Sequence, residues 1–452
     1  MKKYVKDMTS GSPTKLILSF MVPLVIGNIF QQFYNMVDSM IVGKYVGADA
    51  LAAVGATGSL NFLFFSLCNG MASGVGIIMS QHFGAGDADN VKRTIFNAAF
   101  IMVVSGLVMG GLGFILSYPA LRLLNTPANI IDASALYMKI MSAGVLAVAF
   151  YNCIAAMLRA LGDSKTPLYF LIVASILNVI LDLLFVRKFN MGVAGVGIAT
   201  IISQFISGMG SLIFAIIKNP YFKIEKKHLH MDFDIIYQAV RMGVPLAFQS
   251  SLIAISCVAL QRVVNGFGSV VVAAYTATGR IEQLVQQPYN SLGMAMSTYT
   301  GQNIGAGNIE RVKSGYKKGF LIMAIFSFCM MPLAQFFGNV IMNLFVNDAE
   351  VISLGASALK ITSWFYLFLG MIYVTRGLLN GAGDAAFAFI NGLIEMVGRI
   401  CFAKPLTLVP FVGVWGIWFA TGLTWFITGI VSYARYKAGK WKSHVILTNH
   451  AD

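Results

Sequence analysis

Long apolar runs separated by short polar connections dominate the sequence. A helix that crosses a bilayer needs about 20 mostly apolar residues, and twelve stretches of the chain satisfy that requirement. They lie at 14–43, 51–80, 91–117, 130–158, 166–187, 192–217, 236–264, 270–299, 314–339, 351–379, 385–408 and 411–436. The longest connection runs from Lys218 to Asp234 and is too short for a soluble domain. The pattern therefore predicts an all-α polytopic membrane protein with twelve transmembrane helices.

Composition strengthens this prediction. Hydrophobic residues make up 57% of the 452 residues and charged residues only 11%, whereas soluble domains carry about 25% charged residues. So few charged side chains cannot cover a water-exposed surface, which argues against a soluble enzyme and against a disordered chain. The five cysteines all lie in apolar stretches and form no CxxC pair, so we expect them to fill space in the core.

The net charge is +14, and the positively charged residues are distributed along the chain as expected for a membrane protein of one orientation. With the N-terminus inside, twelve spans place both termini in the cytoplasm. The inside connections then carry most of the Lys and Arg residues, as at Lys92-Arg93 and Lys226-Lys227. This asymmetry is the positive-inside rule, and it explains the basic character without a nucleic-acid partner. The first apolar run is too long for a signal peptide and is expected to be an uncleaved span.

The two halves of the sequence resemble each other at a constant offset of 221 residues. The matches include Gly47 with Gly268, Gln81 with Gln302, Gly84-Ala85-Gly86 with Gly305-Ala306-Gly307, Gly162-Asp163 with Gly383-Asp384, and Ala199-Thr200 with Ala420-Thr421. Six spans per half give a parallel repeat around a central cleft, an architecture of secondary transporters. We expect an N-terminal lobe at 1–217, a cytoplasmic linker at 218–235, a C-terminal lobe at 236–437 and a cytoplasmic tail at 438–452.

Four acidic residues lie well inside apolar stretches, where ionisable groups are costly and usually functional. Asn178 and Asp182 are four residues apart and share one face of a helix. Asp38 and Thr200 can reach the same depth, on the outer side of the first lobe. Oxygen donors suit a hard cation, and two close carboxylates tend to share a proton. We therefore expect Asp38, Asn178, Asp182 and Thr200 to bind either H+ or Na+, with no other metal.

The second lobe lacks this set. Asn178 corresponds to Arg399 and Asp182 to Ala403, so the repeated bundle did not need the acids for packing. The remaining two buried acids are Glu282 and Glu395. Glu395 and Arg399 are spaced to pair on one helix face. We expect structural ion pairs for both acids, with Glu282 as an alternative lining of the cleft.

Two further features of the first span are candidates for movement and binding. Pro23 removes a backbone hydrogen bond, and it is either a hinge for this helix or a static kink. The segment from Gln31 to Met36 mixes amide, aromatic and thioether side chains. Its cleft-lining candidates are Gln31, Gln32, Tyr34, Asn35 and Met36.

No nucleotide-binding or hydrolase motif is present. The sequence contains no GxxxxGK[ST], HExxH, GxSxG or GxGxxG. We therefore expect a protein that is not an enzyme and needs no cofactor beyond a coupling ion.

The combination of motifs resembles the multidrug and toxic compound extrusion (MATE) family, in its DinF-like and MepA-like bacterial branch. The residues that carry it are Val22-Pro23-Leu24, Asn35-Met36-Val37-Asp38, Gln81-His82-Phe83-Gly84-Ala85-Gly86, Leu158-Arg159-Ala160-Leu161-Gly162-Asp163 and Asn178…Asp182. The resemblance implies efflux of cationic or amphiphilic drugs across the bacterial cytoplasmic membrane in exchange for H+ or Na+. It places the cation site on Asp38, Asn178, Asp182 and Thr200 and the bending proline on Pro23. We expect a monomer whose partners are the lipid bilayer and small organic molecules.

One alternative stays open at this point. A flippase for a lipid-linked precursor belongs to a related superfamily with the same two-bundle layout. It would need a wide cationic cavity, for which the second half supplies Arg262, Arg280, Arg376 and Arg399.

Overall fold

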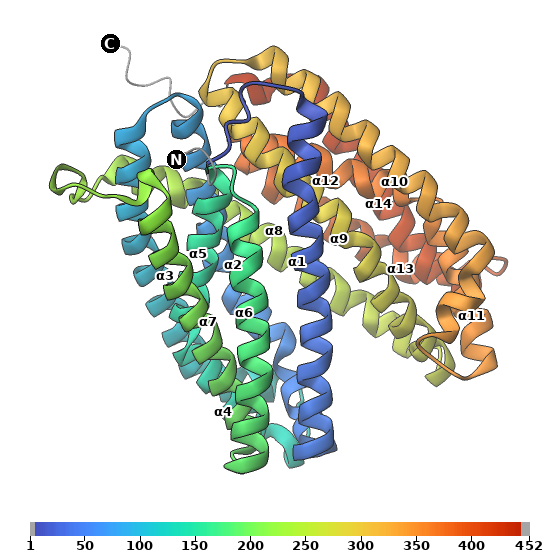
Figure 1. The fold of residues 1–452 in the computed structure, drawn as a ribbon. Helices are drawn as coiled ribbons and strands as arrows, with labels where there is room; N and C mark the ends of the chain where they lie inside the picture. The colour runs from blue at the N-terminus through green and yellow to red at the C-terminus, as the bar shows by residue number, and fades with distance from the viewer. Residues whose placement is uncertain (1–4, 444–452) are drawn as a thin grey trace.

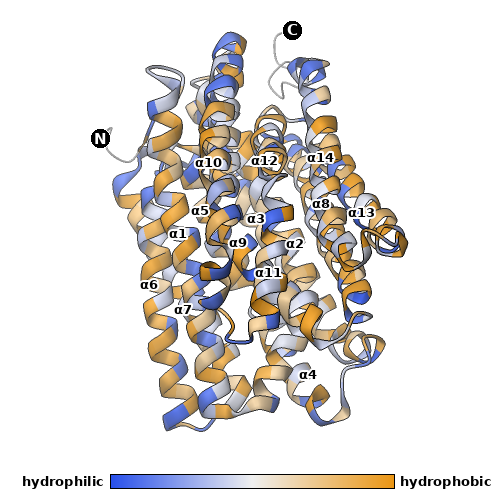
Figure 2. Ribbon diagram, turned by 90° about the vertical axis from the view of Figure 1, so that its right-hand side faces the viewer, coloured by the Kyte–Doolittle hydropathy of each residue, from blue (hydrophilic) through white to orange (hydrophobic). Residues whose placement is uncertain are grey.

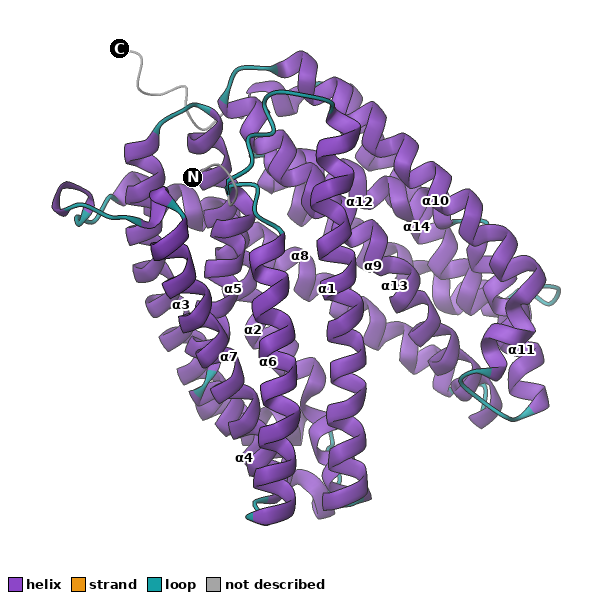
Figure 3. Cartoon of the chain, viewed as in Figure 1, coloured by secondary structure: helices purple, strands orange, loops and turns teal. Residues whose placement is uncertain are grey.

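The computed structural model describes residues 5–443, and this part of the chain is helical without a β-strand (Figure 3). Residues 1–4 and 444–452 lie outside the described residues, so the predicted tail is described only in part. The helices are α1 Pro13–Ile41, α2 Ala48–Gly84, α3 Ala88–Leu123, α4 Ala128–Ala143, α5 Val145–Ala160, α6 Lys165–Asp182, α7 Gly192–Lys218, α8 Phe233–Asn265, α9 Ser269–Gly305, α10 Ile309–Asn343, α11 Ala349–Ser363, α12 Tyr366–Gly381, α13 Ala385–Leu408 and α14 Gly416–Lys437.

Each of the twelve predicted spans corresponds to a helix or to a bent pair of helices. Within the described residues, nine helices are long and apolar enough to cross a membrane, and two bent pairs raise the number to eleven. The pairs are α4 with α5, bent by 48°, and α11 with α12, bent by 53°. The sequence predicted each pair as one span. Apolar composition reports length and does not reveal a bend.

Helix α9 corresponds to the remaining predicted span. It has 37 residues, as many as α2, but it carries more polar side chains and is not among the eleven. It packs against α1, α2, α10, α11 and α12. Polar residues are tolerated within a membrane where they face protein instead of lipid, which explains why this span is the least apolar.

The helices form two lobes, α1–α7 and α8–α14, which lie side by side in Figure 1. Contacts between the lobes are made chiefly by α2 with α8 and α9, and by α1 with α9. In the repeat, α2 is equivalent to α9 and α1 to α8. The contact of α2 with α8 is therefore equivalent to the contact of α1 with α9. The interface is thus built from equivalent helices of the two halves.

The first and last described residues and the connection between the lobes lie on the same side of the molecule (Figure 1). We call this side of the molecule the linker end. The connection packs on α3 there: Lys92 donates to Glu225 at 2.8 Å, and the His228 ring lies 2.9 Å from Asp89. The hydrogen bond from Lys92 lowers the pKa of Glu225, so this carboxylate stays charged at neutral pH. Towards the opposite end the two lobes diverge (Figure 1).

The outer surface is apolar over most of the helix lengths, and polar residues concentrate towards the ends (Figure 2). Large side chains such as Ile115 and Phe336 are 72% and 82% exposed. In water such exposure would favour aggregation, whereas in a bilayer these side chains contact lipid. The structure confirms the predicted all-α polytopic membrane protein with two lobes.

Candidate functional site

Three of the residues predicted to bind a cation contact one another inside the N-terminal lobe. Asn178 and Asp182 are fully buried on α6, and Thr200 faces them from α7. The Asn178 amide donates to Asp182 Oδ2 at 2.8 Å and accepts from the Thr200 backbone N–H at 3.1 Å in the orientation that satisfies both partners. Asn178 therefore holds α6 against α7 and fixes the position of the Asp182 carboxyl group.

Asp38 reaches the same place from α1. Its carboxyl group lies within interaction distance of that of Asp182. Apart from this contact, Oδ1 of each acid is buried without a hydrogen-bond partner among the described residues. Buried polar atoms in proteins are almost always paired. Both acids of this pair therefore keep one carboxyl oxygen unsatisfied, which is exceptional for a buried polar atom.

The surroundings keep water away from these acids. Val42, Val186, Val193 and Val196 form a small apolar cluster with Tyr137 around them. In such surroundings, charge on the carboxyl groups is strongly disfavoured without a counter-ion.

Both acid-bearing helices change geometry directly beyond the acids. The chain passes from α1 into a π-helical turn at Val42–Val46, and from α6 into another at Leu183–Lys188. Single π-helical turns are rare and are frequent at functional sites. No feature of the sequence announced them.

The other candidates on α1 are placed differently from one another. Tyr34 forms a hydrogen bond with Thr200 and so belongs to the acid cluster. Gln31, Asn35 and Met36 are exposed and Gln32 is half-buried.

Pro23 is buried inside α1, which continues through it as one helix from Pro13 to Ile41. The structure therefore shows the position predicted for a hinge and no break in the helix there.

The two predicted acids of the C-terminal lobe differ in their partners. Glu395 lies 4.0 Å from Arg399, the predicted pair, and 3.8 Å from Arg376. Glu282 forms a hydrogen bond with Thr362 and not the expected ion pair, because the neighbouring Arg280 is exposed. Its Oε1 has no partner within residues 5–443.

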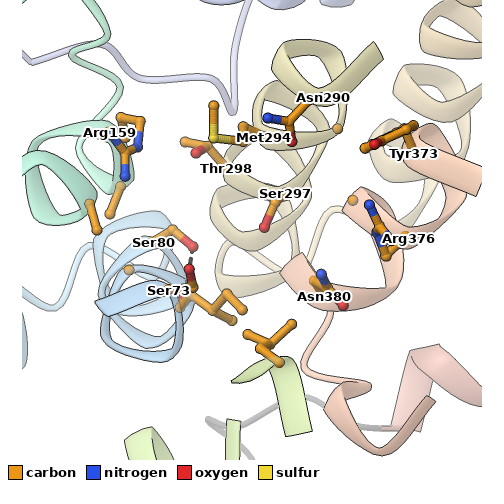
Figure 4. A pocket seen from close by; sticks show the side chains of 17 residues that line it. Ser73, Ser80, Arg159, Asn290, Met294, Ser297, Thr298, Tyr373, Arg376 and Asn380 are labelled. Atoms are coloured by element: carbon orange, nitrogen blue, oxygen red, sulfur yellow. Dashed lines mark hydrogen bonds between the residues drawn. The ribbon is translucent and has the colours of Figure 1, made fainter. Parts of the chain in front are cut away.

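A cavity of about 170 Å³ lies between the lobes towards the linker end (Figure 4). It is lined by the second halves of α2 and α9 and by the last turns of α5 and α12. Arg159 and Arg376 face it from opposite sides, with Asn290, Ser297 and Asn380 between them (Figure 4). Of the four arginines considered above for a flippase, only Arg376 lines this cavity, and none of the predicted cleft-lining residues does.

Two equivalent hydrogen bonds join the lobes beside this cavity. Gln81 Nε2 on α2 donates to the Gly381 carbonyl at 2.9 Å, and Gln302 Nε2 on α9 donates to the Ala160 carbonyl at 2.9 Å. The offset of 221 relates both donors and both acceptors. The sequence revealed the glutamines as a repeated motif, but it could not show that each one crosses to the other lobe.

The fold and the site together define a class: a polytopic membrane protein built from two equivalent bundles, with a buried oxygen-donor cluster in one of them. This is an architecture of secondary transporters. The chain belongs to the MatE family, whose model matches residues 23–184 and 245–403. One match falls in each lobe, as the internal repeat requires, and the resemblance found in the sequence is confirmed.

Relatives and solved structures agree with this assignment. The chain is 32% identical to the "Probable multidrug resistance protein YpnP" of Bacillus subtilis, over 99% of this chain and 100% of that protein. It is 22% identical to the "Multidrug export protein MepA" of Staphylococcus saprophyticus, over 92% and 90%. A solved structure described as the outward-facing conformation of a multidrug resistance MATE family transporter superposes with a TM-score of 0.87 and 22% identity, covering 97% of this chain and 98% of that one. This chain is accordingly a transporter of the MatE family.

Proposed function

We propose that the protein is a secondary multidrug antiporter that exports cationic or amphiphilic compounds in exchange for H+ or Na+. The names of the relatives support the substrate class. The single observation that carries the coupling is the buried pair Asp38 and Asp182, whose Oδ1 atoms have no other partner among the described residues. A bundle that buries such a pair gains stability when a cation binds there.

The four site residues of the N-terminal lobe have different roles. Asp38 on α1 and Asp182 on α6 supply charge, and Asn178 and Thr200 supply neutral oxygens. Without a cation, the two carboxyl groups share one proton or repel each other. Because Asp38 sits on a separate helix, repulsion between the acids would push α1 away from α6. Proton or sodium binding is thus coupled to the position of α1, with Pro23 as the point of bending.

Alternating access follows from the two-lobe arrangement. The lobes are joined beside the cavity by the Gln81 and Gln302 hydrogen bonds and diverge towards the opposite end (Figure 1). A rocking transporter alternates which end of the two lobes is in contact. The basic connections at the linker end support a cytoplasmic position in a bacterial cell for that end and for both termini, by the positive-inside rule. The acids therefore lie on the outer side, where external H+ or Na+ can reach them.

The experiment is drug transport by purified protein in liposomes, with a pH gradient or a sodium gradient imposed separately. Asp38→Asn and Asp182→Asn are expected to lower gradient-driven transport by at least about tenfold, because the isosteric amides remove the charge without a cavity. Glu282→Gln is the matched control: it neutralises the buried acid of the other lobe and should leave coupling to the gradient unchanged. Normal coupling in Asp182→Asn, or its loss in the control alone, would refute the assignment of the site.

A further inference from the structure

The lining of the cavity between the lobes is positively charged, which disfavours binding of a cationic compound. Arg159 and Arg376 line it, and none of its lining residues is acidic. The proposed coupling site is elsewhere, on α1, α6 and α7, and it does not account for these two guanidinium groups. The polarity of this cavity therefore needs an explanation of its own.

Arg159 is the clearer of the two cations. It lies on the last turn of α5, and its side chain makes no ion pair or hydrogen bond within the described part of the chain. Charged groups inside a membrane protein are normally paired. A guanidinium group offers several N–H donors in a planar fork that matches a carboxylate or a phosphate. An unpaired guanidinium group that faces a cavity is thus available to bind an anion.

Arg376 approaches from the other lobe and is held in place. It stacks over the Tyr373 ring at 4.7 Å and lies 3.8 Å from Glu395, which also neutralises Arg399. One carboxylate shared by two guanidinium groups leaves positive charge uncompensated at this point.

Neutral donors complete the lining. Ser297 and Thr298 make no side-chain hydrogen bond to another described residue, so both hydroxyl groups can donate into the cavity. Asn380 also lines it and can contribute its amide N–H group as a donor. Hydroxyl and amide donors next to two guanidinium groups are the surroundings in which proteins bind oxyanions.

The repeat shows that the two cations are not a requirement of packing. At the offset of 221, Arg159 is equivalent to Asn380 and Arg376 to Ala155. Each lobe therefore packs the same helix with a neutral residue at the position where the other lobe has arginine. The space is also sufficient: one water needs about 15 Å³, and the cavity measures about 170 Å³.

We propose that the cavity between Arg159 and Arg376 is a binding site for an oxyanion, a phosphate or carboxylate group that bridges the two lobes. This goes beyond the proposed cation-coupled export, because the ligand has the opposite charge and binds at a different place. The anion can be free in solution or can belong to a lipid headgroup. In both cases Arg159 and Arg376 bind it together, one from each lobe.

The test measures binding of three probes to the purified full-length protein in a neutral detergent. The probes are inorganic phosphate, dihexanoyl phosphatidylglycerol and, as the matched neutral lipid, dihexanoylglycerol. Phosphatidylglycerol that binds at least about tenfold more tightly than phosphate identifies a lipid headgroup, and equal affinity identifies a free anion; both support the site. Absence of binding by both anions, or equal binding of the neutral lipid, overturns it.

Variants locate the site. Arg159→Gln and Arg376→Gln should each weaken anion binding by at least about tenfold, and Arg159→Lys should restore part of it, because a point charge keeps the attraction without the fork. Lys165→Gln is the control, since Lys165 is an exposed cation at the same end that does not line the cavity.

A second change guards against loss of folding in the arginine variants. Ser297→Asp keeps both arginines and places a carboxylate in the cavity, so it should abolish anion binding. Unchanged binding in Ser297→Asp or in a folded Arg159→Gln contradicts the proposal. Because the readout is binding and not transport, its failure is distinguishable from failure of the antiport mechanism.

Discussion

The contact between the lobes beside the cavity depends on two glycines, because a side chain at either position would collide with the other lobe. A Cβ atom built on Gly84 would lie 1.9 Å from the Gln302 carbonyl oxygen, and one on Gly305 would lie 1.9 Å from the Gln81 carbonyl oxygen. Both obstacles are backbone atoms of the other lobe, so no side chain can rotate away. The double variant Gly84→Ala/Gly305→Ala should therefore force the lobes apart at the linker end.

The size of this effect follows from the same distances. Real Cβ contacts essentially never fall below 3.0 Å, so each alanine requires a separation of about 1.1 Å. A movement of that size along the Gln81 and Gln302 hydrogen bonds would lengthen them from 2.9 Å to about 4 Å, beyond hydrogen-bonding distance. Losing two hydrogen bonds costs about 2 kcal/mol. The conformation closed at the linker end should become less populated by roughly 30-fold.

The assay is a distance measurement between spin labels at positions 88 and 308. These exposed positions lie at the linker end of the two lobes, and the five native cysteines are replaced beforehand. The alanine variant should shift the distance distribution to longer values and lower drug transport in liposomes by at least about tenfold.

A control with the same chemistry is available on the same two helices. Gly58 and Gly279 are also related by the repeat, and a Cβ atom on either meets nothing within 4 Å. Gly58→Ala/Gly279→Ala should leave both the distances and the transport rate unchanged. If the Gly84/Gly305 variant behaved like this control, the reasoning that these glycines close the linker end would be refuted.

Three further predictions concern stability. Asp384 is buried and accepts two hydrogen bonds from Arg435, at 2.8 and 3.0 Å; Asp384→Asn should destabilise the C-terminal lobe by about 3 kcal/mol or more, and an unchanged melting temperature in detergent would contradict this. Glu395→Gln should destabilise the protein by a similar amount, about 3 kcal/mol, because it removes the carboxylate that neutralises the buried Arg399 and the half-buried Arg376. Asp182→Asn should cost less than about 1 kcal/mol, since it relieves repulsion between two acids. Equal melting temperatures for these two variants would argue against the difference between the lobes. Lys92→Gln removes a pairing with an exposed carboxylate and should change stability by less than about 1 kcal/mol, as measured by the same melting curves.

The sequence predicted the helices well and their bends poorly. Apolar length identified the span that became α4 and α5, because twenty apolar residues suffice to detect a crossing. It did not reveal the 48° bend between them, since a bend depends on what the helix packs against. The same limit explains α9: its polar residues follow from its enclosure by other helices, and only the fold shows that enclosure.

The candidate site was predictable as far as helical spacing reaches. Asn178 and Asp182 share a face because they are four residues apart, and the structure places them 2.8 Å from each other through the amide and Oδ2. The hydrogen bond of Tyr34 to Thr200 joins two helices far apart in sequence, and no periodicity predicts the rotation that brings them together. In the sequence Arg159 appears only as part of the motif Leu158–Asp163, because whether a cation faces water, a carboxylate or a cavity depends on tertiary structure.

The internal repeat gives both lobes one scaffold, and their differing side chains give each lobe a different role. At the position where the N-terminal lobe has Asn178, the C-terminal lobe has Arg399, whose guanidinium group donates to Ser256 at 2.9 Å and pairs with Glu395. The neutral Asn178 amide binds Oδ2 of Asp182 and leaves its Oδ1 without a partner among the described residues, whereas the Arg399 guanidinium group brings a positive charge of its own to Glu395. An ion can shift a conformational equilibrium only through a difference in binding free energy between two states. Under the proposed antiport mechanism, the N-terminal lobe would therefore be the one that responds to the gradient. The C-terminal lobe, in which Glu395 and Asp384 are paired with arginines, would then serve as the rigid body against which the first lobe moves.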